Sequence, residues 1–217
     1  MAIYGKGIYE KGKHVSKING KHTKEYLVWR TMISRCYNPQ YLEKHPTYEK
    51  VEVCSEWLYF QNFCEWFENN YYTIKNEIID LDKDFICSIN NIENKIYSPD
   101  TCIFIPQEIN KLLVFQSRKT LDLPVGVKRN GNKYNAVIVK KIFNEKCENK
   151  KKEIFLGNYD TPEQAYEVYY KNKNEYILYV LEYYKDYIPK NVYNIIFEFV
   201  NKDCLRNLHK KQEIILN

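Results

Sequence analysis

Two acidic residues stand near the start of the stretch LDKDFICSINNIENKIYSPDTCIFIPQEIN, which covers residues 81–110. Asp82 and Asp84 carry carboxylates, the oxygen ligands that ions such as Mg²⁺ prefer. A divalent ion bound by carboxylates can assist the hydrolysis of a phosphodiester. The same residues also suit an ordinary polar turn between two strands, so the residue types leave both interpretations open.

Short elements must position these residues if they act together. We expect a strand that carries Asp82, then a polar, asparagine-rich loop. A short β-prone run follows at residues 102–105, and a helix-like segment then reaches Asn110. The stretch therefore predicts a strand, a loop, a second strand and a helix.

The residues before this stretch predict two amphipathic helices. In KEYLVWRTMISRCY, residues 24–37, apolar residues recur every three or four positions, which indicates one buried face. Residues 38–53 contain two prolines and are predicted to be a loop. Ser55 is the expected N-cap of the next helix, whose predicted core face is Trp57, Phe60, Cys64 and Phe67. A further strand is expected at residues 7–9.

The second half predicts a small sheet and a helix after a linker at residues 117–123. The dipeptide Asn130-Gly131 separates two β-prone runs and predicts a hairpin. A charged loop then leads to a third strand, EIFLGNY. Thr161, Pro162 and Gln164 form the sequence pattern of a capped helix start. Another helix is expected after Pro189.

Basic residues gather on the predicted strands of this second half. They are Lys128, Arg129, Lys133, Lys140 and Lys141. A β ribbon can enter the major groove of DNA, where such side chains contact phosphates and base edges. The alternative is that these charges only keep one face of a sheet in contact with water.

The segment PVGVKRNGNKYNAVI, together with IFLGNYDTPEQAYEVYYKNKNEY, resembles the plant ethylene-response-factor (APETALA-two) type of DNA-binding domain. The matching features, over about 50 residues, are Gly126-Val127, Tyr134-x-Ala136, Leu156-Gly157-x-Tyr159-x-Thr161 and Glu163-x-Ala165. In that family the sheet lies in the major groove. The resemblance implies DNA contacts by Lys128, Arg129, Lys133, Tyr134 and Lys140. Lysines stand here for most of the family's arginines, and a lysine cannot bind guanine in the forked manner of arginine.

The stretch 81–110 resembles a divergent branch of the HNH nucleases that is common in bacteriophages. The shared pattern is Leu-Asp-Lys/Arg, then Tyr-Ser-Pro-x-x-Cys, then Asn. The segments WRTMISRCYNP and VCSEWLYFQNFCEWF, and the order of the two parts, also resemble that phage group, so the likeness covers most of residues 25–177. It implies a ββα unit that holds one Mg²⁺ or Mn²⁺ ion.

Residue by residue, the HNH resemblance implies that Asp82 and Asn110 are the metal ligands. It also places Asp82, Lys83 and Asn110 among the catalytic residues. Lys83 occupies the place of the general-base histidine, and a lysine ordinarily holds its proton at neutral pH. It can still stabilise charge on a phosphate. The family's middle asparagine falls near Tyr97 or Ser98, so that ligand is replaced here.

Composition restricts the remaining classes of function. Of the 217 residues 44% are apolar, which suffices for a core, and the net charge of +5 neither requires nor opposes a nucleic-acid partner. Seven widely spaced cysteines argue against a disulfide framework, and no zinc is expected. No apolar run has transmembrane length, and the first 20 residues lack the apolar core of a signal peptide. A cytoplasmic protein without a membrane partner is expected, in the host cell if the chain is phage-encoded.

Together these features predict an α+β chain. It would have a helical and ββα HNH-like unit at 1–116, a linker at 117–123, an ethylene-response-factor-like DNA-binding domain at 124–180 and a helical tail at 181–217. The expected function is that of a phage or mobile-element protein which binds double-stranded DNA. A metal-dependent homing or nicking endonuclease is one alternative, and a non-cleaving DNA-binding or accessory protein that keeps the fold is the other. The sequence does not decide the oligomeric state.

Overall fold

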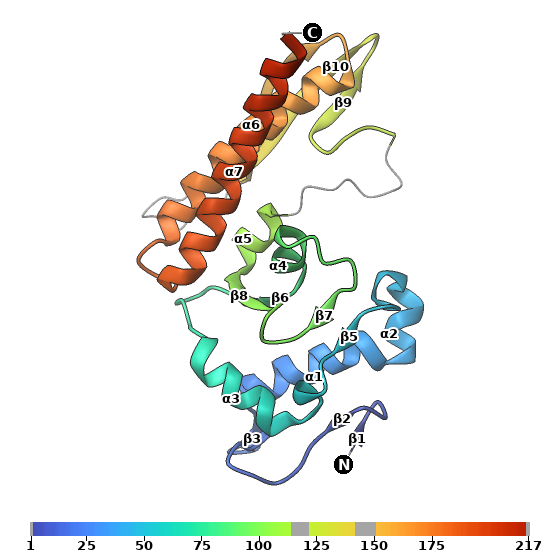
Figure 1. The fold of residues 1–217 in the computed structure, drawn as a ribbon, viewed down its shortest axis with the longest axis vertical. Coiled ribbons are helices and arrows are strands. Elements are labelled where there is room, and N and C mark those ends of the chain that lie inside the picture. The colour runs from blue at the N-terminus through green and yellow to red at the C-terminus, as the bar shows by residue number, and fades with distance from the viewer. Residues whose placement is uncertain (1, 114–121, 142–150, 216–217) are drawn as a thin grey trace. The chain divides into compact units, whose positions relative to one another are not determined.

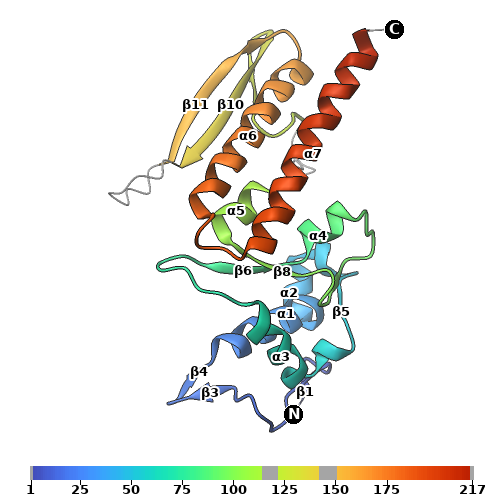
Figure 2. The same ribbon diagram turned by 60° about the vertical axis from the view of Figure 1, so that its left-hand side comes forward.

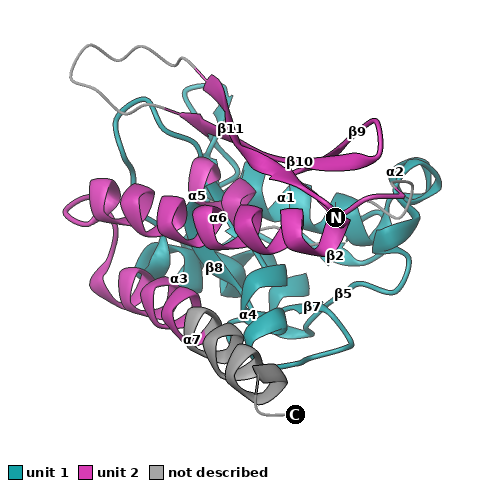
Figure 3. Cartoon of the chain, turned by 90° about the horizontal axis from the view of Figure 1, so that it is seen from above, with its two compact units in different colours: residues 1–106 teal, residues 107–217 magenta. Residues whose placement is uncertain are grey.

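The computed structural model describes residues 2–113, 122–141 and 151–215, with side chains as far as residue 202. The chain is a mixed α+β protein, which confirms the predicted class at that level. It forms two compact units, residues 1–106 and 107–217 (Figure 3). Most of the predicted linker and the charged loop at residues 142–150 lie outside the described residues. No helix in the described ranges is long and apolar enough to cross a membrane.

The two predicted helices of the first unit are present. Helix α1 spans Lys24–Tyr37 and α3 spans Phe60–Asn70 (Figure 1). All four residues of the predicted core face around α3 are buried. The indole Nε1 of Trp29 donates a hydrogen bond to the backbone oxygen of Trp57 at 2.8 Å, which ties α1 to the turn before α3.

Two local predictions for the chain between α1 and α3 were wrong. The expected loop contains helix α2 (Pro39–Lys44) and the 3₁₀ turn η1 (Pro46–Tyr48). Pro39 and Pro46 are the first residues of α2 and η1. A backbone N–H at that position would have no acceptor within the helix, so its absence in proline costs no hydrogen bond. Ser55 is not the N-cap of α3, because it is followed by the 3₁₀ turn η2 (Glu56–Leu58) and α3 begins only at Phe60. The Ser55 side chain forms no capping hydrogen bond with η2.

The strands of the first unit are short and pair in twos. Strand β1 (Ala2–Ile3) pairs with β2 (Gly7–Ile8), β3 (Lys17–Ile18) with β4 (Lys21–His22), and β5 (Glu52–Val53) runs parallel to β7 (Ile96–Tyr97). Strand β6 (Ile79–Asp82) is antiparallel to β8 (Ile103–Pro106), with Asp82 opposite Ile103. The chain between β6 and β8 is not one continuous loop as predicted, because it contains helix α4 (Asp84–Ile89) and β7.

The second unit begins with the short helix α5 (Gln107–Leu112) and contains one three-stranded antiparallel sheet. Strand β10 (Lys133–Lys141) lies between β9 (Val127–Asn130) and β11 (Lys151–Tyr159). Helix α6 (Pro162–Tyr184) packs against the sheet, and α7 (Lys190–Ile215) packs along α6 (Figure 2). Helix α6 ends at Tyr184, so it extends beyond residue 180, the predicted end of the DNA-binding domain.

Turn chemistry explains the two ends of strand β9. The Val127 N–H donates to the Pro124 oxygen at 3.1 Å, and Gly126 has a φ of 81°. These are features of a type II turn, which needs a positive φ at its third residue. At the other end a two-residue loop joins Asn130 to Lys133 and confirms the predicted hairpin, with Gly131 at a φ of 59°.

The start of helix α6 also follows its sequence signature. Thr161 Oγ1 accepts a hydrogen bond from the Gln164 N–H at 3.3 Å, and Pro162 is the first helical residue. The Gln164 side chain accepts in return from the Asp160 N–H, one residue earlier than in the usual capping box. This reciprocal capping fixes where the helix leaves the sheet.

Candidate nucleic-acid interface and acidic site

The sheet of the second unit has two chemically different faces. One face packs against α6, and its centre is formed by Val127 and Ala136, which meet Ala165 of the helix. We call it the helix face. The opposite face, which we call the open face, is defined by alternation and register. Its members are Lys128, Asn130, Lys133, Asn135, Val137, Val139, Lys141, Lys151, Glu153, Phe155 and Asn158.

The five residues with predicted DNA contacts divide between these faces. Lys128 and Lys133 lie on the open face and are exposed. Arg129 and Tyr134 are opposite one another on the helix face, where the guanidinium carbon lies 5.5 Å from the Tyr134 ring centre. Lys140 shares that face, with its ammonium 5.5 Å from the centre of the Tyr176 ring on α6. The structure thus brings two of the five residues to the open face.

Both lysines of the open face form exposed ion pairs. Lys128 Nζ lies 2.7 Å from a Glu153 carboxylate oxygen and crosses the central strand to reach it. Lys133 Nζ lies 3.0 Å from Asp160 Oδ1. Exposed pairs of this kind contribute about 0–1 kcal/mol, so a phosphate can replace the carboxylate at little cost.

Sequence reasoning missed the uncharged part of the open face. Asn135 lies between Asn130 and Asn158 and accepts a hydrogen bond from each. Val139 and Phe155 expose 50% and 61% of their surfaces and add two apolar groups to this face. The period-two alternation that buries Ala136 and Ile138 was the signal that could have assigned the residues of β10 to their faces.

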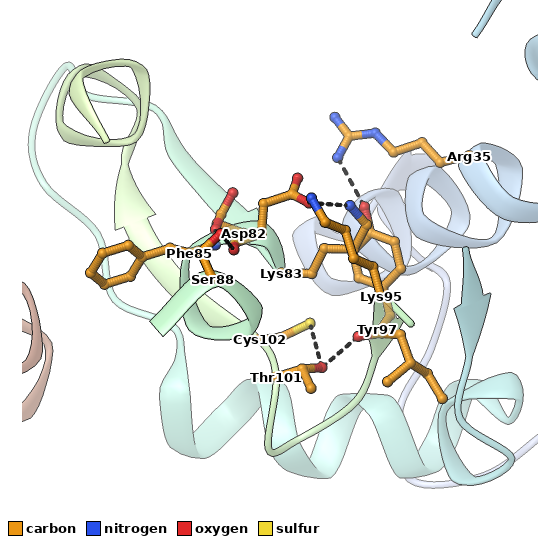
Figure 4. A network of polar contacts seen from close by, with 11 residues as sticks. Arg35, Asp82, Lys83, Phe85, Ser88, Lys95, Tyr97, Thr101 and Cys102 are labelled. Carbon is orange, nitrogen blue, oxygen red and sulfur yellow. Dashed lines mark hydrogen bonds and ion pairs between the residues drawn. The ribbon is translucent and has the colours of Figure 1, made fainter. Parts of the chain in front are cut away.

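Asp82 of the first unit is a buried carboxylate at the end of β6. Its Oδ1 accepts a hydrogen bond from the Phe85 N–H at 2.7 Å, in the first turn of α4 (Figure 4). Burial raises the pKa of Asp82 above its ordinary value, and this outweighs the hydrogen bond and the nearby Lys83 ammonium. The residue thus serves as a helix cap while carrying a charge that its surroundings oppose.

Lys83 is buried between aromatic rings and an acid. Its Nζ donates to Asp84 Oδ1 at 2.9 Å and lies 4.8 Å and 5.4 Å from the ring centres of Tyr48 and Tyr97. Lys95 Nζ contacts the same Asp84 oxygen at 2.5 Å. Burial opposes ionisation of Asp84, but the two ammonium groups hold its pKa below the ordinary value. The side chain at the general-base position is therefore held by Asp84 and by the Tyr48 and Tyr97 rings.

The other predicted metal ligand, Asn110, lies on α5 in the second unit, whereas Asp82 belongs to the first. Within the described ranges, no group of three or more His, Cys, Asp or Glu side chains is placed to hold a metal ion. Any ion at Asp82 would have to retain most of its water ligands, as Mg²⁺ commonly does.

The described cysteines behave as apolar core residues. Cys36, Cys64, Cys87 and Cys102 are buried thiols, and Cys54 is half-buried. Burial raises the pKa of Cys36 to about 12, so this thiol stays protonated at neutral pH.

No protein-family model, curated protein or solved structure matches the chain.

Proposed function

We propose that the chain binds double-stranded DNA through the open face of its second unit. The observation that carries the proposal is the pair of exposed lysines, Lys128 and Lys133, at one end of a sheet whose other face is covered by α6. Sheets can enter the major groove, and lysines that contact phosphates supply affinity without sequence preference. The resemblance to the ethylene-response-factor domain, which uses its sheet in this way, supports the same orientation.

The charge balance of the open face favours a polyanion. Lys141 and Lys151 are opposite one another at the far end of the face. The face thus carries lysines at both ends, and Glu153 is its only acid among the described residues. A duplex laid along the strands would meet lysines toward each end, with asparagines, apolar residues and the Lys128–Glu153 ion pair between them.

A matched pair of double variants tests which face binds DNA. We expect Lys128→Ala with Lys133→Ala to weaken binding and to flatten the slope of log affinity against log salt by about 2 units, since each lost phosphate contact removes about 0.9. Arg129→Ala with Lys140→Ala removes the same charge from the helix face, and we expect a much smaller change in slope. Fluorescence anisotropy with a labelled duplex, at several salt concentrations, measures both.

Equal losses from the two double variants would contradict the choice of face. Failure of the full chain to bind any duplex at about 50 mM salt, where phosphate-driven binding is strong, would contradict DNA binding itself. Glu153→Gln provides a gain-of-function check, because it releases Lys128 from its carboxylate partner and should tighten binding.

A second candidate function is metal-dependent DNA cleavage. Strands β6 and β8 form an antiparallel pair, α5 follows β8 directly in the chain, and Asp82 ends the first strand. This β–β–α order in the chain, with the resemblance to phage HNH nucleases, supports a role for Asp82 as a ligand of one Mg²⁺ or Mn²⁺ ion and for Lys83 in stabilising phosphate charge. Asn110, the other ligand that the resemblance implies, belongs to the second unit. On this proposal the chain is a homing or nicking endonuclease of a phage or mobile element, and otherwise a DNA-binding accessory protein.

A further inference from the structure

Three asparagines form a hydrogen-bonded row across the open face, one from each strand. Asn135 Oδ1, on the central strand, accepts from Asn158 Nδ2 at 2.7 Å and from Asn130 Nδ2 at 3.3 Å. The two outer side chains are exposed, and the central one is half-buried. Asn135 thereby fixes the orientation of two exposed amides whose side chains would otherwise rotate.

Each outer amide keeps a donor and an acceptor for another partner. A side-chain amide has two N–H donors and one carbonyl oxygen, and Asn135 takes up one donor from each neighbour. The remaining N–H and oxygen of Asn130 and Asn158 match adenine in the major groove, where N7 accepts and the N6 amino group donates. Guanine presents two acceptors at the same positions and leaves the amide oxygen without a donor.

The apolar residues of the same face fit the other base of an A·T pair. Phe155 and Val139 are on adjacent strands and are exposed on the open face. In the major groove thymine displays a C5-methyl group, which apolar side chains contact, whereas cytosine displays an amino group. Burying an amino group against Phe155 without a hydrogen-bond partner would cost binding free energy.

The side chain best suited to guanine is turned away. Arg129, the one arginine in strands β9 to β11, is on the helix face beside Tyr134. Arginine is the usual bidentate partner of guanine, and lysine supplies no equivalent fork. The open face among the described strands therefore offers amides and apolar groups, with lysines beside them and one acid, Glu153, whose carboxylate is bound by Lys128.

We propose that the open face recognises A·T base pairs in the major groove. Asn130 and Asn158 contact adenine N6 and N7, Phe155 and Val139 contact thymine methyl groups, and Asn135 acts as the positioning residue. The proposal rests on the DNA binding proposed above and specifies which bases that surface distinguishes.

Base analogues test this recognition on the full wild-type chain. We compare an A·T-rich duplex, a G·C duplex of equal length, and A·T duplexes with 7-deazaadenine in place of adenine or uracil in place of thymine. The first analogue lacks N7, and the second lacks only the methyl group. We expect binding to weaken about tenfold for the G·C duplex and for 7-deazaadenine, the lower part of the range for a bidentate contact, and to a smaller extent for uracil.

Protein variants assign the contacts to residues. Asn158→Ala should remove most of the A·T over G·C preference while leaving the salt slope unchanged, since no phosphate contact is lost. Asn135→Ala should reduce the same preference without a matching loss of affinity for G·C duplex, which a purely structural role would not produce. Asn201→Ala, on α7, is the matched control and should change neither quantity.

The possible outcomes distinguish A·T recognition from DNA binding by the open face. Absence of binding to every duplex would overturn DNA binding as a whole. Salt-sensitive binding that is equal for A·T and G·C duplexes, and indifferent to 7-deazaadenine, would overturn A·T recognition and leave DNA binding intact. Sensitivity to uracil and 7-deazaadenine that survives Asn158→Ala would remove Asn158 from the contact surface.

Discussion

Gly126→Ala is expected to destabilise the second unit by about 2–5 kcal/mol. Gly126 has a φ of 81°, where an L-residue costs about 1–2 kcal/mol. An added Cβ would also lie 2.0 Å from a ring carbon of Tyr169, so this half-buried turn has no room for it. Overpacking of this kind costs a further 1–3 kcal/mol or so. Chemical denaturation followed by circular dichroism measures the loss.

Gly131→Ala is the matched control. Gly131 also has a positive φ, 59°, but a Cβ added there would have no neighbouring atom within 4 Å. We expect a loss of only about 1–2 kcal/mol at this position, from the backbone conformation alone. Equal losses at both sites would show that contact with Tyr169 contributes nothing. All three tryptophans, Trp29, Trp57 and Trp66, lie in the first unit, so their fluorescence monitors that unit separately.

Local patterns predicted much of this fold because the forces involved are local. The apolar spacing in residues 24–37 needs only one buried face to become a helix, and α1 has those bounds. The cap at Thr161 and the hairpin after Asn130 likewise depend on a few neighbouring residues. Helix α4 was missed because six residues, DFICSI, are too few to show a period, and its cap comes from Asp82 just outside it.

The candidate interface was harder to predict because residue type does not say which face a side chain occupies. Tyr134 and Lys140 look like surface residues, yet both share a face with the buried Ala136. The register of β11 shifts beside Ala136, where Gly157 and Phe155 are successive partners and Leu156 is the extra residue. A bulge of this kind depends on the paired strand and moves every later residue to the opposite face. The contacts among Asn130, Asn135 and Asn158 depend on the register of all three strands, so the sequence alone does not predict them.

Asp82→Asn is expected to raise the stability of the first unit near neutral pH. An asparagine oxygen can accept the same hydrogen bond from Phe85, and the two residues are about equally good caps. The substitution removes the Asp82 carboxyl group, whose pKa is raised above its ordinary value of 3.8, chiefly by burial.

The raised pKa of Asp82 determines whether the free energy of unfolding rises or falls with pH. As pH rises, the unfolded chain loses the Asp82 proton before the folded chain does, because the folded pKa is higher. Between the two pKa values the folded state binds more protons, so the free energy of unfolding falls as pH rises through this window. Above the folded pKa the full cost is present. The gain from Asp82→Asn should therefore appear at pH 7 and disappear in acid.

Asp84→Asn is the control of opposite sign. Lys83 and Lys95 hold the Asp84 pKa below its ordinary value, so its charge stabilises the folded state above the unfolded pKa and this contribution is lost as pH falls through the folded pKa. We expect Asp84→Asn to lower stability at pH 7. Thermal unfolding of both variants at several pH values, followed by tryptophan fluorescence, compares them within one unit. Destabilisation by both variants would contradict the cost assigned to the Asp82 charge.

The same Asp82→Asn variant tests cleavage with a readout independent of stability. If the chain nicks supercoiled plasmid with Mg²⁺ or Mn²⁺, we expect this variant to lose cutting by at least the roughly 10²-fold typical of removing a catalytic group, although it is more stable than the wild type. Duplex affinity should change little, because binding is assigned to the second unit. Cutting that survives in Asp82→Asn would exclude Asp82 as a metal ligand. If the wild-type chain binds DNA but does not cut it with either ion, the role of Asp82 is limited to capping helix α4. That result would favour the non-cleaving DNA-binding protein.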